Sequence, residues 1–165
     1  MLSANYEPTI SMKISSRGII FDWYAVETMV ALIKRQWKET LYQPLRVLAL
    51  GKGAMIPARL LAGEAPVYYE GVTSYVGEMS GEIEHYQRGP IEYNLSPAGV
   101  AINDPDTLVV DDLWDTGQTF RWAKQQLPLA TFCALMTKIP AEETFLDYFG
   151  LSFSTKAWIH FPWET

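Results

Sequence analysis

The chain reads VVDDLWDTGQT over residues 109–119, and this stretch decides the fold. An apolar run from Thr107 to Val110 predicts a buried strand that leads directly into two adjacent acids, Asp111 and Asp112. A short loop of small polar residues follows, and a helix is predicted from there to about residue 126. A strand, a loop and a helix in this order are typical of an open α/β sheet, in which ligands bind beyond the carboxyl ends of the strands.

The loop after the two acids has the character of an anion site. Its small residues let backbone N–H groups converge, and the start of a helix adds positive potential, so the loop suits a phosphate group. Two carboxylates beside a phosphate would repel it unless they hold ribose hydroxyls or a magnesium ion. In the alternative interpretation, Asp111 and Asp112 only cap the turn, and Thr116 and Thr119 only satisfy its backbone. That alternative is weaker because Asp115 and the Thr-Gly-Gln-Thr loop follow the pair.

Strand and helix alternate on both sides of this stretch. A helix is expected after Asp22, and further elements are predicted as strands over residues 45–50, 66–75, 131–136 and 157–159 and as a short helix over residues 56–62. Residues 1–20 are expected to form an irregular arm. Residues 76–90 are polar and rich in glycine, which is typical of a functional lid or a disordered loop. The sequence therefore predicts one α/β domain over residues 1–165, with a mainly parallel sheet flanked by helices.

Composition excludes several classes of function. The 165 residues carry a net charge of −6, which disfavours nucleic-acid binding because phosphate neutralisation requires a basic face. A single cysteine, Cys133, lies in a predicted buried strand, and with only two histidines no zinc-type cluster can be assembled. The first residues lack an apolar signal core, and no apolar run approaches the length of a membrane helix. We therefore expect a soluble cytoplasmic protein without a membrane partner.

The quoted stretch resembles the ribose-phosphate signature of the type I phosphoribosyltransferases, specifically the purine branch that contains the xanthine-guanine and hypoxanthine enzymes. Further stretches resemble the same family and are collinear from about residue 22 to residue 164. Residues 48–59 (LALGKGAMIPAR) resemble its pyrophosphate loop, although Ala54 stands where a second glycine is common. Residues 73–75 and the segment after them resemble its mobile hood loop, here about 76–90. Residues 137–140 (TKIP) and 158–164 (WIHFPWE) resemble its base pocket and its C-terminal ending.

The resemblance implies transfer of ribose 5-phosphate from 5-phosphoribosyl 1-pyrophosphate to a purine-like base, with release of pyrophosphate and with Mg²⁺ as cofactor. Carboxylates near the sugar would stabilise the cation-like ribose of the transition state. The implied catalytic residues are Asp115, which takes or shares the proton of the base nitrogen, and Asp111 and Asp112, which bind the ribose hydroxyls directly or through Mg²⁺, with Asp112 as the metal ligand.

The resemblance also implies which residues bind the rest of the substrates. Closure of the hood loop would exclude water from the activated carbon. The 5-phosphate would be held by Thr116, Gly117, Gln118 and Thr119, the pyrophosphate by Lys52 and Gly53, and the base by Lys138, Trp158 and Ile159. At the pyrophosphate loop we expect a cis or otherwise strained peptide between Gly51 and Lys52 in at least one state of the protein.

Other interpretations were weighed against this one. A non-catalytic regulatory protein of the same fold that binds phosphoribosyl pyrophosphate or a nucleotide is the main alternative. A phosphoacceptor receiver domain is disfavoured by the order of its acids, and a P-loop enzyme by the lack of a Gly-x4-Gly-Lys-Ser/Thr motif. The accepted base stays open, because His160 stands where guanine-type relatives carry an acid. The resemblance also implies a homo-oligomer.

Overall fold

The computed structural model describes residues 10–76, 79–85 and 102–164, and its centre is a sheet of five parallel strands. The strand β3 (Arg46–Leu50) and the first four residues of β7 (Thr107–Trp114) are mostly apolar and buried, as expected for a parallel sheet with helices on each side. The predicted mainly parallel α/β sheet is confirmed. The spatial order of its strands is β4 (Val67–Glu70), β3 (Arg46–Leu50), β7 (Thr107–Trp114), β8 (Thr131–Thr137) and β9 (Tyr148–Ser152).

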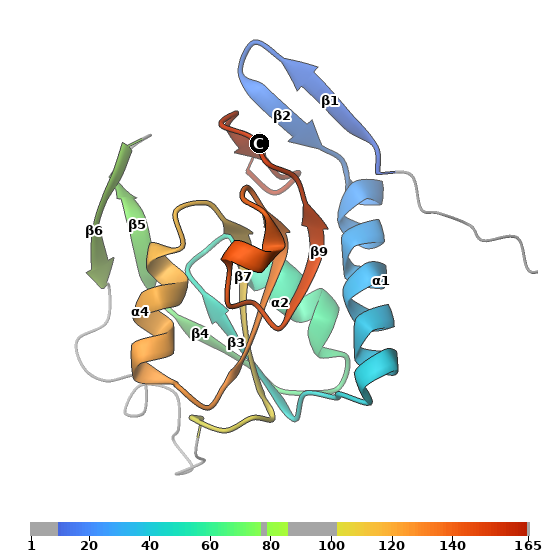
Figure 1. Cartoon of the computed structure of the whole chain (residues 1–165), viewed down its shortest axis with the longest axis vertical. Helices are drawn as coiled ribbons and strands as arrows, with labels where there is room; N and C mark the ends of the chain where they lie inside the picture. Colours follow the sequence, from blue (N-terminus) through green and yellow to red (C-terminus); the bar gives the residue numbers. More distant parts are fainter. Residues whose placement is uncertain (1–9, 77–78, 86–101, 165) are drawn as a thin grey trace, which may run out of the picture.

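Helices cover both faces of this sheet (Figure 1). On one face, α1 (Trp23–Thr40) and α2 (Met55–Ala62) pack against the sheet through residues such as Met29 and Ala58. On the other face, α4 (Gln118–Gln126) packs through Phe120 and Ala123. A short 3-10 helix, η1 (Ala141–Glu143), lies between β8 and β9. No helix in the described ranges is long and apolar enough to span a membrane.

The expected irregular arm is wrong where the chain is described. Residues 12–21 form an antiparallel hairpin of β1 (Met12–Ser15) and β2 (Gly18–Phe21), and β10 (Ile159–His160) pairs in parallel with β2. The strand predicted over 157–159 therefore belongs to this small sheet rather than to the central one. The fifth central strand is β9, which was not predicted. The physical reason is that these short strands depend on partners distant in the sequence, so local patterns alone do not specify them.

The segment after β4 also differs from the prediction. The extended run over 66–75 divides at Gly71, after which β5 (Val72–Val76) leaves the central sheet and pairs antiparallel with β6 (Met79–His85). Part of the predicted 76–90 lid or disordered loop is therefore a strand, because β5 offers it a pairing edge. Residues 77–78 and 86–90 of that predicted loop lie outside the described residues.

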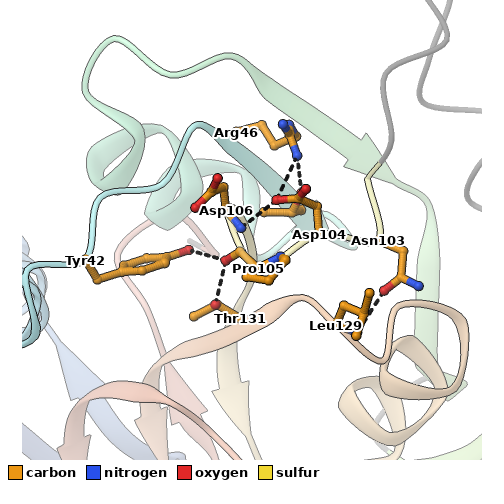
Figure 2. A network of polar contacts seen from close by, with 9 residues as sticks. Tyr42, Arg46, Asn103, Asp104, Pro105, Asp106, Leu129 and Thr131 are labelled. Carbon is orange, nitrogen blue, oxygen red and sulfur yellow. Dashed lines mark hydrogen bonds and ion pairs between the residues drawn. The ribbon is translucent and has the colours of Figure 1, made fainter.

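A polar network fixes the amino end of the sheet, opposite the cavity described below (Figure 2). The carbonyl oxygen of Pro105 accepts hydrogen bonds from the hydroxyls of Tyr42, at 3.4 Å, and Thr131, at 2.8 Å. Arg46 Nη1 lies 3.5 Å from Asp104 Oδ1, so the loop that precedes β7 is tied to β3. These contacts hold β7, which carries the acidic pair, in register with its neighbours.

Candidate active site

The carboxyl ends of β3, β7 and β8 border a cavity of about 320 Å³, and the C-terminal residues 158–164 form part of its wall. This is the edge where parallel α/β sheets bind ligands. All the site residues predicted from the sequence line this one cavity, although the first and last of them lie more than a hundred positions apart. They are Lys52, Gly53, Asp111, Asp112, Asp115, Thr116, Gly117, Gln118, Thr119, Lys138, Trp158 and Ile159.

The acidic pair lies on β7 itself, because this strand continues to Trp114 instead of ending at Val110 as predicted. The backbone N–H of Asp112 donates a hydrogen bond of 2.9 Å to Asp111 Oδ1, which fixes the two side chains relative to each other. Burial, followed by the charge of its neighbour, raises the pKa of Asp111 well above its usual value. Burial and then the nearby Glu164 carboxylate raise the pKa of Asp112 to about 6. Two crowded carboxyls of this kind favour a cation or hydroxyl donors between them.

Glycine at position 53 allows Asp112 to reach its place. A Cβ atom built on Gly53 would overlap the Asp112 carboxylate, so any larger residue would displace one of the two. The backbone of Gly53 does not adopt a positive φ. Glycine is therefore required here because the Asp112 carboxylate occupies the space of a Cβ atom, not because of the backbone conformation. The pyrophosphate-loop segment and the acidic pair are therefore in direct contact across β3 and β7.

The neighbouring residue Gly51 adopts φ 68°, a left-handed conformation that favours glycine. Its N–H donates to the carbonyl of Glu70 at 2.8 Å, and a Cβ there would lie 2.6 Å from the carbonyl oxygen of Val72. Lys52 follows with an exposed side chain at the rim of the cavity. No cis peptide bond occurs in the described part of the chain, so the peptide between Gly51 and Lys52 is trans in this structure. A cis or strained peptide in another state stays a prediction.

Residues 116–119, named here the phosphate loop, connect β7 to α4. Gly117 has φ 76°, and a Cβ on it would lie 2.6 Å from Trp114 Cζ2, so the loop backbone lies directly on the indole ring. The loop ends at the N-terminus of the nine-residue helix α4, where backbone N–H groups lack helical partners. The predicted anion site requires such a loop at the start of a helix.

Lys138 and Asp115, which both line the cavity, form an ion pair with 3.0 Å between Nζ and Oδ1. The Lys138 side chain is only 8% exposed, and its backbone N–H donates to the carbonyl of Trp114 at 2.9 Å. Nearby, the carbonyl of Trp158 accepts a hydrogen bond of 2.8 Å from Ile19 of the small sheet. Trp158 is 39% exposed and lines the cavity wall.

Some residues of the cavity were not predicted as site residues. Tyr69 and Phe161 line it, and so does Glu164, which accepts a hydrogen bond of 3.1 Å from the backbone of Phe161. Burial raises the pKa of Glu164. Glu164 is the final acid of the WIHFPWE ending, and its place in that pattern is the one sequence signal that could have identified it as a cavity residue. His160 does not line the cavity; its Nε2 atom lies 3.1 Å from the carbonyl oxygen of Arg17 in the hairpin.

The fold and this cavity define an α/β protein with an anion cradle at a helix start and an acidic pair beside it. No protein-family model matches the chain. It is 33% identical to the xanthine-guanine phosphoribosyltransferase of Gluconobacter oxydans over 122 residues, which are 72% of this chain and 68% of the relative. It is 26% identical to the enzyme of the same name from Idiomarina loihiensis over 154 residues, which are 91% and 89% of the two chains.

Solved structures share the fold. A purine phosphoribosyltransferase from Pyrococcus horikoshii is 23% identical with a TM-score of 0.60, covering 88% of this chain and 93% of the other. A protein from Neisseria gonorrhoeae with bound ppGpp is 21% identical with a TM-score of 0.65, covering 88% of each chain. The chain therefore belongs to the type I phosphoribosyltransferases, a family of glycosyl-transferring enzymes. Within that family, its sequence relatives place it in the purine branch.

Proposed function

We propose that this protein transfers the 5-phosphoribosyl group of phosphoribosyl pyrophosphate to a purine-type base and releases pyrophosphate, as in nucleotide salvage. One observation carries the proposal: the acidic pair, the phosphate loop and the Gly-flanked Lys52 all line one cavity. Each of the three groups suits one part of the donor substrate: the ribose, the 5-phosphate or the pyrophosphate. Because the three groups lie far apart in the sequence, packing alone is a poor explanation for their position around one cavity.

The sugar and its two phosphate ends divide between these groups. The phosphate loop would hold the 5-phosphate through backbone N–H groups and the hydroxyls of Thr116 and Thr119. Lys52 and the backbone of Gly53 would hold the leaving pyrophosphate. Asp111 and Asp112 would bind the ribose hydroxyls, and their negative charge would stabilise the positive charge that develops on the ribose as the pyrophosphate leaves.

The carboxylate oxygens of Asp111 and Asp112 also suit Mg²⁺. This ion binds through one or two carboxylates together with substrate phosphates and waters, and Asp111 and Asp112 offer two adjacent carboxyls at the cavity. No group of three or more His, Cys, Asp or Glu in the described residues makes a metal site by itself. When bound, Mg²⁺ would offset the charge of the leaving pyrophosphate. Asp112 is the proposed ligand.

The base would enter between Trp158 and Lys138. Trp158 would stack on its ring, Ile159 would border it, and Lys138 would donate a hydrogen bond to an exocyclic oxygen. Asp115 would accept the proton of the attacking nitrogen. Because His160 turns toward the hairpin, it does not read the base, and we propose a 6-oxopurine as the acceptor on account of Lys138 and of relatives named xanthine-guanine phosphoribosyltransferases. Oligomeric assembly and a cytoplasmic location stay predictions.

The test is pyrophosphate release from phosphoribosyl pyrophosphate and Mg²⁺ with xanthine, guanine, hypoxanthine or adenine, each against a reaction without base. Release that depends on a 6-oxopurine supports the proposal. Tight binding of phosphoribosyl pyrophosphate in calorimetry, without release for any base, would instead support the non-catalytic regulatory alternative.

A further inference from the structure

Arg121 lies in the first turn of α4, on the outer side of the phosphate loop, and does not line the cavity. Its side chain is exposed, yet Nη1 donates a hydrogen bond of 2.7 Å to the carbonyl oxygen of Thr116. Its backbone N–H donates to the carbonyl of Gly117 at 2.9 Å. Arg121 is therefore attached to two successive peptides of the loop.

The same guanidinium lies over the Trp114 ring, with 5.9 Å between Cζ and the ring centroid. Trp114 is 1% exposed and stacks on Phe120 with 5.1 Å between centroids, so its position is fixed by the core. Gly117 rests on this indole as well. One buried ring thus supports both the loop backbone and the cation that binds it.

We propose that Arg121 is a positioning residue for the phosphate loop, which it holds in the form that presents the Gly117 N–H to the 5-phosphate; this inference rests on the proposed function. The Thr116 carbonyl and the Gly117 N–H belong to one peptide group. A short charge-assisted hydrogen bond to the carbonyl polarises that group and makes its N–H a stronger donor.

The charge of the cavity adds to this argument. Three aspartates and Glu164 line it, and Lys138 is already paired with Asp115. A phosphate on the loop therefore approaches a negative surface, and Arg121 provides a positive charge directly behind the loop. Because it acts through the Thr116 carbonyl, Arg121 strengthens phosphate binding without occupying the space that the substrate needs.

The test compares Arg121→Gln, which removes the charge but retains a donor, with Arg121→Lys, which retains the charge. Titration calorimetry measures the affinity for a purine nucleoside 5′-monophosphate and for the matching nucleoside. For R121Q we expect the dissociation constant of the monophosphate to rise about 10-fold, the scale of one charged hydrogen bond. The nucleoside should bind as it does to the wild type. R121K retains the charge but loses the planar guanidinium over Trp114, so it should weaken monophosphate binding less than R121Q does and leave nucleoside binding unchanged.

Kinetics give a second readout. R121Q should raise KM for phosphoribosyl pyrophosphate by a similar factor and leave kcat nearly unchanged, because Arg121 touches no reacting atom. The matched control is Lys124→Gln on the same helix, whose Nζ lies 4.7 Å from the Phe132 ring centroid and away from the loop. In a Trp114→Phe background, R121Q should have a smaller effect, since the two residues act together.

Three outcomes would overturn the inference: unchanged monophosphate affinity in R121Q, an equal loss for nucleoside and monophosphate, or an equal loss in K124Q. The last two would mean that Arg121 only stabilises the fold. Failure of the proposed function looks different, because the wild type would then bind the monophosphate without releasing pyrophosphate for any base. A wild type that binds no monophosphate would overturn both.

Discussion

The ammonium nitrogen of Lys138 lies 3.0 Å from Oδ1 of Asp115, which joins the proposed base-binding lysine to the proposed general base. Both side chains are largely withdrawn from water, at 8% and 26% exposure. An entering base that hydrogen-bonds to Lys138 therefore approaches an existing ion pair. The pair holds the two groups side by side, so that both would act on one edge of the base ring.

This arrangement predicts the behaviour of Asp115→Asn. Turnover should fall about 10²-fold or more, because an amide cannot accept the base proton. Binding of phosphoribosyl pyrophosphate should change little, since Asp115 lies on the base side of the loop. Pyrophosphate release and calorimetry measure the two effects, with the exposed Glu143→Gln as the matched control for loss of an acid. Full activity of D115N would remove Asp115 from the mechanism.

Lys52 makes a separate prediction about the leaving group. Lys52→Ala should weaken phosphoribosyl pyrophosphate binding by about 10-fold or more and leave binding of the free base nearly unchanged, because only the first ligand carries pyrophosphate. Calorimetry with each ligand distinguishes a role in pyrophosphate binding from a role in the fold. The Lys38→Ala variant, at an exposed position on α1, controls for the loss of one positive charge. Equal losses for both ligands would assign Lys52 to the fold.

Contact between Gly53 and Asp112 gives a steric prediction. Gly53→Ala should destabilise the protein by about 1–3 kcal/mol and reduce turnover, because the added Cβ displaces the Asp112 carboxylate. The double variant G53A/D112A removes the overlap and should regain most of the lost melting temperature while staying inactive. If G53A alone is as stable and active as the wild type, the close approach does not matter for the site.

The site could be predicted from the sequence because its signals are local. The strand, acidic pair and small-residue loop are continuous from Thr107 to Thr119, and Lys52 is flanked by two glycines directly after a buried strand. Each pattern specifies its own conformation, and the parallel sheet then brings the strand ends to one edge.

The parts that were predicted wrongly depend on distant partners. β10 has only two residues and exists because Ile159 and His160 find β2 at the other end of the chain. Gly18 approaches the Trp158 carbonyl so closely that a Cβ would overlap it, a requirement that no local pattern reveals. Likewise Tyr69 reaches the cavity only because β4 lies beside β3. Such relationships appear only when the chain has folded.

A final prediction concerns Glu70, at the carboxyl end of β4. This side chain is fully buried, and neither carboxylate oxygen has a hydrogen-bond partner in the described structure. Burial raises its pKa, because the charged form is disfavoured away from water. The folded protein therefore holds this proton more tightly than the unfolded chain does. The free energy of unfolding must then fall as pH rises from the ordinary carboxyl pKa through the raised one.

Glu70→Gln removes the charge and preserves the shape. At pH 8 it should stabilise the protein by about 1–3 kcal/mol, the scale of one buried unsatisfied group, which corresponds to about 2–4 °C in melting temperature for each kcal/mol. Well below the ordinary carboxyl pKa the difference from the wild type should largely vanish, because Glu70 is then protonated in both the folded and the unfolded chain. Asp111, Asp112 and Glu164 also have raised pKa values and make the wild type less stable at high pH, but they are common to both proteins and cancel in the comparison.

The exposed Glu142→Gln should show no such pH dependence. If E70Q stabilises the protein equally at both pH values, packing rather than ionisation explains the difference in stability between the two proteins. Only an ionisable group makes that difference depend on pH.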